Sequence, residues 1–258
     1  MEKPYPDSLN KPPLIEMIVE IRFTSSLPDE ALFGLYYPII KKSFPDYKSL
    51  PILNIPLAAR TSDPVLTHQP HYSFFGDNEL SLLIGPRVLT FRYDRFRDGK
   101  EYNYPGWRDS IAEFIASLTN EIFSVLSLQS IERIGVRYLD FLESIKLYDY
   151  ITPTFSFPNR DLERVQVTCS ILEGNVLHNI NLSDSAEYKH HFKNKLMEHK
   201  LGSLIDIDSE YRPVNYQDFL AETKDILTMM HDGNKNLFYE IMKNKLVDID
   251  EPRGKEKS

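Results

Sequence analysis

The sequence of 258 residues has little cysteine and no long apolar run, and Cys169 is its single cysteine. One cysteine excludes an intramolecular disulfide, which is typical of proteins in a reducing compartment. A membrane-spanning helix needs about 18 or more predominantly apolar residues in a row, and no stretch approaches that length. The first residues, Met1 to Asp7, lack the apolar core of a signal peptide. We therefore expect a cytoplasmic protein without a membrane partner.

The sequence also lacks the short motifs that identify common enzymes and cofactor sites. It contains no G-x-S-x-G elbow, no Walker loop and no H-E-x-x-H. Several histidines fall in polar stretches without the spacing of a metal site. These are His68 and His71 in an expected loop, and His190, His191 and His199 in an expected helix, Lys189 to Lys200. We predict no metal, no cofactor and no catalytic residue, while an enzyme stays open because catalytic residues need not be adjacent in sequence.

Positive charge is scarce as well, with 30 Lys and Arg against 38 Asp and Glu and a net charge of -8. A protein that binds nucleic acid needs a concentrated positive surface. Residues 92–107 mix basic and aromatic side chains of the kind that hold phosphates and stack on bases. Asp94, Asp98 and Glu101 offset the cations of this segment. We therefore do not expect a nucleic-acid partner, and a loop anchored by aromatic residues is the alternative interpretation.

The apolar pattern, with 41% hydrophobic residues, predicts an α+β fold with a sizeable core. Strands are expected at Leu14 to Phe23, Ile52 to Ala59, Tyr72 to Phe75, Glu79 to Ile84, Arg87 to Tyr93, Ile131 to Phe141, Glu163 to Leu172, Asn175 to Leu182 and Leu204 to Ile207. Helices are expected at Asp29 to Phe44, Trp107 to Leu128, Asn215 to Met230 and Asn234 to Val247. Cys169 falls on the apolar face of one predicted strand, so we expect a buried structural thiol.

The order of these elements divides the chain into two similar halves. Residues 12–128 and residues 129–248 each contain a strand, a helix or variable crossover, antiparallel strands and a long helix. Residues 249–258 are expected to be a frayed C-terminal tail. A duplicated unit of this kind would join two antiparallel sheets packed against long helices. The expected architecture is a saddle or a helix-grip-like fold.

Four stretches carry a resemblance that extends over nearly the whole chain. They are Asn10 to Glu16 with Ile21 to Phe23, Tyr104 to Trp107, Ile131 to Asp140, and Met230 to Asp232 with Asn236 to Phe238. Taken in order, they resemble an uncharacterised, sporadically distributed prokaryotic family of proteins of about this length. The chain departs from that pattern at Asp140, where asparagine is expected. The resemblance implies no reaction or ligand, but its scattered occurrence is similar to that of bacterial defence or toxin–antitoxin genes.

Seven residues are candidates for contact with a ligand or partner. They are Arg92, Tyr104, Trp107, Arg133, Arg137, Tyr138 and His231. Arg133 and Arg137 share one face of a predicted strand and flank Gly135, so they could clamp a phosphate or carboxylate. Ion pairs to acidic residues of a neighbouring strand are the alternative. His231 is expected where a helix ends before Gly233, either interacting with the helix C-terminus or contacting a ligand.

These observations leave three functions in order of preference. The first is a non-enzymatic binding or interaction protein, with a protein partner or a second copy of itself, in a defence or toxin–antitoxin-like module. The second is a small-molecule or nucleotide-binding protein with a cavity between sheet and helices, using Arg133, Arg137 and nearby aromatic residues. The third is a nucleic-acid-binding protein that uses residues 92–107. A deep pocket would favour the second function, and an exposed apolar patch the first.

Overall fold

The computed structural model describes residues 9, 12–77, 79–107, 111–144, 165–192, 195–213 and 215–242. Its strands are β1 (Leu14–Ser25), β2 (Asp46–Ser49), β3 (Tyr72–Phe75), β4 (Leu80–Gly85), β5 (Val88–Asp94), β6 (Phe96–Arg97), β7 (Lys100–Glu101), β8 (Leu128–Glu143), β9 (Gln166–Glu173), β10 (Val176–Phe192) and β11 (Lys195–Tyr211). Its helices are α1 (Asp29–Ile40), η1 (Pro51–Asn54), α2 (Leu57–Ser62), α3 (Pro64–Thr67), α4 (Ala112–Phe123), α5 (Tyr216–Ala221) and α6 (Thr223–Ile241).

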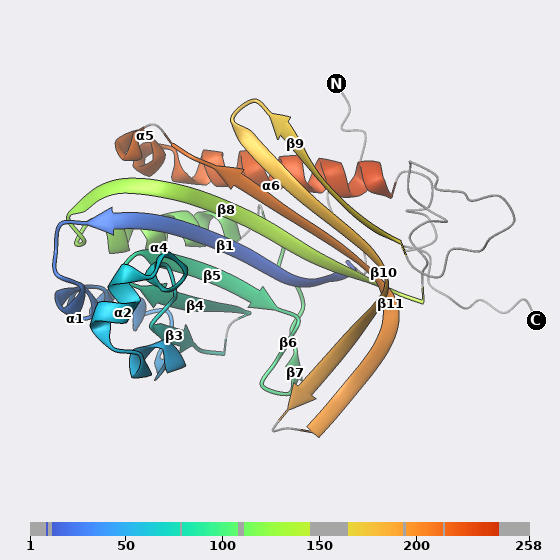
Figure 1. Cartoon of the computed structure of the whole chain (residues 1–258), viewed down its shortest axis with the longest axis horizontal. Helices are drawn as coiled ribbons and strands as arrows, with labels where there is room; N and C mark the ends of the chain where they lie inside the picture. Colours follow the sequence, from blue (N-terminus) through green and yellow to red (C-terminus); the bar gives the residue numbers. More distant parts are fainter. Residues whose placement is uncertain are drawn as a thin grey trace, which may run out of the picture.

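One antiparallel sheet of nine strands extends through the molecule in the order β2-β3-β4-β5-β1-β8-β11-β10-β9 (Figure 1). Its centre is the pair β1 and β8, which runs from Leu14 opposite Asp140 to Ser25 opposite Leu128. Hydrogen bonds between these two strands join the strands of residues 14–94 to those of residues 128–211. The hairpin of β6 and β7 forms a separate small sheet beside it.

Alternation of apolar and polar side chains explains why β1 and β8 form strands with one buried face. Met17, Val19 and Ile21 of β1 are fully buried and alternate with partly exposed residues. In β8 the register shifts between the pairs Arg22–Arg133 and Phe23–Ile131, which marks a β-bulge. The bulge turns Ile131 onto the buried face, although its odd number would otherwise place it beside Arg133.

Helices cover one face of the sheet, and the main core lies between them and the strands. In Figure 1, α4 and α6 lie behind the sheet. They also contact each other, since Lys224 of α6 forms an ion pair with Glu113 of α4 at 2.8 Å. Ile115 of α4 and Leu227 and Met230 of α6 are fully buried in this layer. The opposite face of the sheet carries polar and charged side chains along its central strands.

The predicted fold class is wrong in its main feature. One sheet of nine strands replaces the two expected sheets, strands outweigh helices by 46% to 32%, and most described helices are short. The expected helix from Trp107 to Leu128 ends earlier, because α4 closes at Phe123 and Leu128 already begins β8. The physical reason is that β1 pairs along its whole length with residues 128–140 of β8, which merges both sets of strands. The division between residues 128 and 129 stays a prediction, and residues 249–258 lie outside the described residues.

Three local predictions are also corrected. Ile52 to Ala59 is not a strand, because Pro51 and Pro56 introduce η1 and α2 there. Lys189 to Lys200 is not a helix, since it forms the tip of the β10–β11 hairpin, where cross-strand hydrogen bonds outweigh local helix propensity. Cys169 is exposed rather than buried, because β9 is an edge strand whose side chains remain largely open to solvent.

The C-terminal helices differ from the prediction at Gly233. Asn215 caps α5 as predicted, and its side chain accepts a hydrogen bond from the Gln217 N–H at 2.9 Å. However, α6 continues without a turn through His231 and Gly233 to Ile241. A Cβ atom at Gly233 would lie 2.9 Å from the His178 ring, so glycine permits close packing of α6 on β10. None of the described helices is long and apolar enough to cross a membrane.

Candidate ligand cavity

A cavity of about 800 Å³ lies where α6 passes over the end of β8. Four segments that are distant in sequence form most of its walls, and Leu9, Tyr93 and Arg95 complete the lining. The four segments are residues 12–14 at the start of β1, residues 102–107 after β7, the β8 residues Tyr138 and Asp140, and one side of α6 from His231 to Tyr239. Aromatic and proline side chains dominate these walls. A pocket of this size and lining is typical of small-molecule sites.

Strand and helix geometry explains how β8 and α6 direct side chains into the cavity. Tyr138 and Asp140 are two residues apart on β8, so they share the face that the helices cover. On α6, His231, Lys235 and Phe238 recur at intervals of four and three residues and share one side of the helix. Asn234 fixes this helix to the sheet, since its Nδ2 lies 3.1 Å from the Val136 carbonyl and 3.0 Å from the Ile207 carbonyl.

A chain of polar contacts links three elements in the cavity wall. The Tyr138 hydroxyl lies 2.7 Å from Nδ1 of His231 and 3.2 Å from the Tyr104 hydroxyl. Burial raises the pKa of both tyrosines above the ordinary value, so both remain protonated near neutral pH. Each hydroxyl can therefore donate one hydrogen bond and accept another.

Trp107 completes this wall and holds the imidazole in place. Its ring stacks on His231 with centroids 4.8 Å apart and planes 9° apart. Its Nε1–H donates to the Thr228 hydroxyl at 3.2 Å. The His231 ring is therefore fixed by a stacked indole and by a hydrogen bond to Tyr138, a positioning that suits a defined recognition surface.

Asp140 is the exceptional group of the cavity. The residue is only 7% exposed, yet no hydrogen bond or ion pair among the described residues involves its side chain. Burial raises the pKa of its carboxyl group to about 7, because the charged form is removed from water without a compensating cation. A buried carboxyl that opens into a cavity without a protein partner is a strong indication of a ligand contact.

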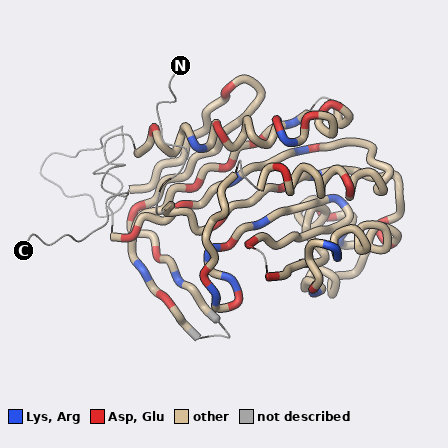
Figure 2. Tube along the Cα trace, turned by 180° about the vertical axis from the view of Figure 1, so that it is seen from behind, with Lys and Arg blue, Asp and Glu red and all other residues tan. Residues whose placement is uncertain are grey.

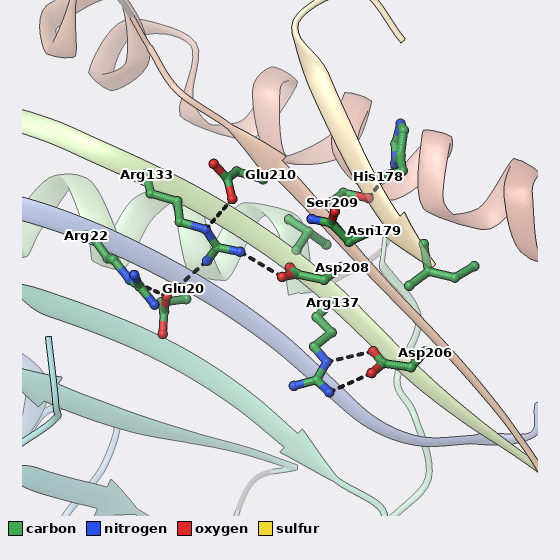
Figure 3. A network of polar contacts seen from close by, with 12 residues as sticks. Glu20, Arg22, Arg133, Arg137, His178, Asn179, Asp206, Asp208, Ser209 and Glu210 are labelled. Carbon is green, nitrogen blue, oxygen red and sulfur yellow. Dashed lines mark hydrogen bonds and ion pairs between the residues drawn. The ribbon is translucent and has the colours of Figure 1, made fainter. Parts of the chain in front are cut away.

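Arg133 and Arg137 lie on the opposite face of the sheet from this cavity and have acidic partners (Figure 3). Arg133 is held by Glu20 at 3.0 Å, Asp208 at 2.8 Å and Glu210 at 2.9 Å. Arg137 makes two 2.7 Å hydrogen bonds to the carboxylate of Asp206. These are the cross-strand ion pairs that the sequence analysis gave as the alternative to an anion clamp. A Cβ at Gly135 would lie 2.6 Å from Nη1 of Arg133, so Gly135 makes room for that guanidinium group.

Residues 92–107 serve two different parts of the structure. Arg92 forms ion pairs with Glu16 at 2.5 Å and Asp94 at 2.8 Å, and Arg95 pairs with Glu101. Residues 102–107, in contrast, bring Tyr104 and Trp107 into the cavity wall. Lys and Arg are interspersed with Asp and Glu along the described chain (Figure 2), and the absence of a nucleic-acid partner stays a prediction.

The seven candidate residues therefore separate into two groups. Tyr104, Trp107, Tyr138 and His231 converge on the cavity, whereas Arg92, Arg133 and Arg137 belong to ion pairs. The sequence analysis missed Asp140 as a site residue. The available signal was its even spacing from Tyr138, which places an acidic side chain on the otherwise apolar face of β8.

The comparisons with known proteins add no name to this site. A scan of protein-family models finds no match to the chain, and a search of curated proteins finds no similar sequence. Among the described residues, no group of three or more His, Cys, Asp and Glu side chains is arranged to hold a metal ion. The function of the chain is therefore argued from the geometry of the cavity.

Proposed function

We propose that this protein binds a small molecule in the cavity between α6 and the sheet. The observation that carries the proposal is Asp140, a carboxyl group that is buried, unpartnered among the described residues and open to an aromatic-walled cavity. A buried charge without a partner destabilises a fold by on the order of several kcal/mol. A ligand that donates hydrogen bonds to Asp140 would remove this penalty.

The aromatic walls support the same function. Tyr104, Trp107 and Tyr138 line one side of the cavity, and Phe238 and Tyr239 of α6 line another. Rings of this kind offer flat apolar contact area together with a few polar groups at fixed positions. This combination favours the second function of the sequence analysis, with different residues: the aromatic side chains take part, but Arg133 and Arg137 do not.

Trp107 provides a direct test, because it is the single tryptophan of the chain and forms part of the cavity wall. Its fluorescence should change when a ligand enters the cavity. Native mass spectrometry of the protein from its own host would identify the bound mass, and that compound should shift Trp107 emission in a saturable way. A co-purifying compound that binds the wild type and a Tyr104→Ala, Phe238→Ala double variant equally would contradict the proposal.

A second candidate function is self-association through the projecting part of the β10–β11 hairpin. These two strands extend beyond the sheet (Figure 1), since β9 pairs with β10 only as far as Ser183 and β8 pairs with β11 only from Gly202 onward. Met197 and Leu201 are 54% and 60% exposed on this projection. Exposed apolar side chains on a projecting ribbon favour a protein interface.

We infer that the partner of this ribbon is a second copy of the chain. Lys189 forms an ion pair with Glu187, and Lys200 with Glu198 at 2.8 Å. Residues 187–201 carry four lysines against two glutamates, and two of these lysines, Lys189 and Lys200, are paired within the ribbon. The exposed apolar side chains Met197 and Leu201 are the groups that a two-fold interface would join. Phe96 packs against one face of the ribbon through Tyr188 and His190, which leaves the face of Met197 and Leu201 for the second copy.

A further inference from the structure

We propose that the ligand is a planar aromatic ring bearing two adjacent N–H donors, as in an aryl amidine or a guanine-type base, and that both donors bind the Asp140 carboxylate. The inference rests on the proposed small-molecule function and deepens it by naming the ligand class. It follows from the acceptor that the cavity presents, from the groups around that acceptor and from the shape of the walls.

The Asp140 carboxylate is the hydrogen-bond acceptor that the cavity presents to a ligand. An ionised carboxylate only accepts hydrogen bonds, and its two oxygens match a pair of parallel N–H donors. The hydroxyl of Tyr138, the nearest polar group on the same face of β8, is already bonded to His231 and Tyr104. No described side chain donates to Asp140, so a ligand that brings two donors completes the site.

Among the described residues, no element around Asp140 supplies a competing partner. On the neighbouring strands, the residues opposite Asp140 are Leu14 of β1 and Ile205 of β11, both apolar. The loop after β7 contributes the neutral phenol of Tyr104. The basic groups at the cavity are His231 and Lys235 from α6 and Arg95 after β5, and none of them bonds to Asp140.

These basic groups are engaged elsewhere. Arg95 is bound to Glu101 at 2.9 Å, and His231 is held by Tyr138 and the Trp107 ring. The ammonium group of Lys235 lies 5.9 Å from the centre of the Tyr239 ring, within the range of a cation–π contact. The cavity therefore offers one buried acceptor rather than a set of free cations, which disfavours an anionic ligand.

The aromatic lining of the cavity indicates the part of the ligand that does not bind Asp140. Tyr104, Trp107 and Phe238 line the cavity together with Asp140, and Pro12 and Pro13 line it beside the start of β1. Flat aromatic ligands stack on such rings. The cavity of about 800 Å³ has room for a ring system with a substituent. A planar ring with an N–C–N donor edge satisfies both the walls and the carboxylate.

The proposal makes the affinity depend on pH in a defined direction. The donor pair binds the ionised form of Asp140, whose pKa is about 7 in the free protein. Its ionised fraction rises from about a tenth at pH 6 to about nine tenths at pH 8, so affinity should rise roughly tenfold. A ligand that instead accepted a hydrogen bond from the neutral acid would bind more weakly as pH rises.

Benzamidine is the first probe, because its charge does not change between pH 6 and pH 8. Binding is measured by calorimetry and by Trp107 emission, beside benzoate and benzyl alcohol as ring-matched controls. We expect benzamidine to bind best and about tenfold more tightly at pH 8 than at pH 6. Asp140→Asn should weaken benzamidine at least tenfold and remove most of its pH dependence while leaving benzyl alcohol unchanged. Asp140→Ser provides a second variant, and the thermal melt of each verifies its fold.

Guanosine and inosine distinguish a neutral base from a cationic amidine. Inosine lacks the 2-amino group, so a base-type ligand requires guanosine to bind more tightly than inosine in the wild type but not in Asp140→Asn. If benzyl alcohol binds in the cavity but benzamidine and guanosine do not, the ligand class is wrong and the small-molecule function stands. If no probe binds and no compound co-purifies, both are wrong. Equal benzamidine affinity in the wild type and in Asp140→Asn would also overturn the ligand class.

Discussion

Asp140 of β8 and Asp206 of β11 occupy neighbouring positions of the sheet but face opposite sides of it. Asp140 lies opposite Ile205, the residue before Asp206, and the two aspartates are 7% and 8% exposed. Asp206 binds the guanidinium group of Arg137 through both of its oxygens, whereas Asp140 opens into the cavity without a partner among the described residues. We therefore expect two equally buried aspartates on adjacent strands to have opposite effects on stability.

Replacing Asp140 with asparagine should stabilise the free protein at alkaline pH. The pKa of Asp140 rises from 3.8 to about 7 on folding, so the unfolded chain ionises first as pH increases. The stability that this residue contributes in its neutral form is complete below pH ~4, falls between pH ~4 and pH ~7, and stays lost above that range. At pH 8 we expect the free energy of unfolding of Asp140→Asn to exceed that of the wild type by up to about 4 kcal/mol. Urea titrations at pH 4, 6 and 8 measure the difference, which should disappear towards pH 4.

Asp206→Asn is the matched control, and we expect the opposite sign. The substitution leaves Arg137 without its carboxylate, although the half-exposed guanidinium group keeps contact with water. The free energy of unfolding should fall by about 1–2 kcal/mol at pH 8. Binding of cavity ligands should not change, because Asp206 faces the other side of the sheet. If both variants shift stability in the same direction, the two aspartates do not differ as the geometry indicates.

Tyr138→Phe should loosen the polar chain in the cavity wall. The variant removes the hydroxyl group between Tyr104 and His231 and leaves the aromatic ring. We expect a loss of about 1 kcal/mol in stability and a change in Trp107 emission, since Trp107 stacks on the imidazole that loses its bond. Tyr36→Phe is the control, because Tyr36 is 2% exposed in α1, outside the cavity lining. A change in emission that is as large in Tyr36→Phe would contradict the assignment.

Arg133→Ala should destabilise the protein more than Arg137→Ala. The Arg133 side chain is 15% exposed and forms ion pairs with three acidic residues, whereas Arg137 is 42% exposed and forms its ion pair with Asp206. Removing Arg133 leaves partly buried carboxylates without a cation, so we expect a loss of about 3 kcal/mol. The loss for Arg137→Ala should be about 1 kcal/mol. Thermal and urea melts measure the two losses and show which is larger. If both variants stay folded but bind a ligand more weakly, the two arginines form an anion-binding site after all.

Parts of the fold could be predicted from local pattern alone. The alternation of apolar and polar residues predicted strands at β1 and β8, because the side chains of a half-buried strand repeat every two residues. The pairing of β1 with β8 depends on hydrogen bonds between residues more than a hundred positions apart, which no local pattern records. The polar stretch from Lys189 to Lys200 was misassigned for the same reason, since its partner strand decides its structure.

The candidate site was predictable only in part. Tyr138 and His231 were chosen on separate grounds, and α6 brings them together over the sheet. Asp140 was not chosen, because a single acidic residue in a strand is common and only burial makes it unusual. Arg133 and Arg137 were candidates for a ligand, with cross-strand ion pairs as the alternative. Strand parity shows their shared face but does not show that Asp206, Asp208 and Glu210 of β11 share it too.

The last prediction concerns the projecting ribbon of β10 and β11. If it joins two copies, a charge in its apolar face should separate them, so Leu201→Glu and Met197→Glu should each convert a dimer to a monomer. Light scattering after size exclusion measures the mass across a range of concentrations. Val65→Glu in α3 is the control, because Val65 is 73% exposed outside the ribbon and its variant should remain dimeric. Both ribbon variants should keep the melting temperature of the wild-type monomer, since these side chains contribute little to the core. A wild-type protein that is monomeric at high micromolar concentration would rule out the self-association.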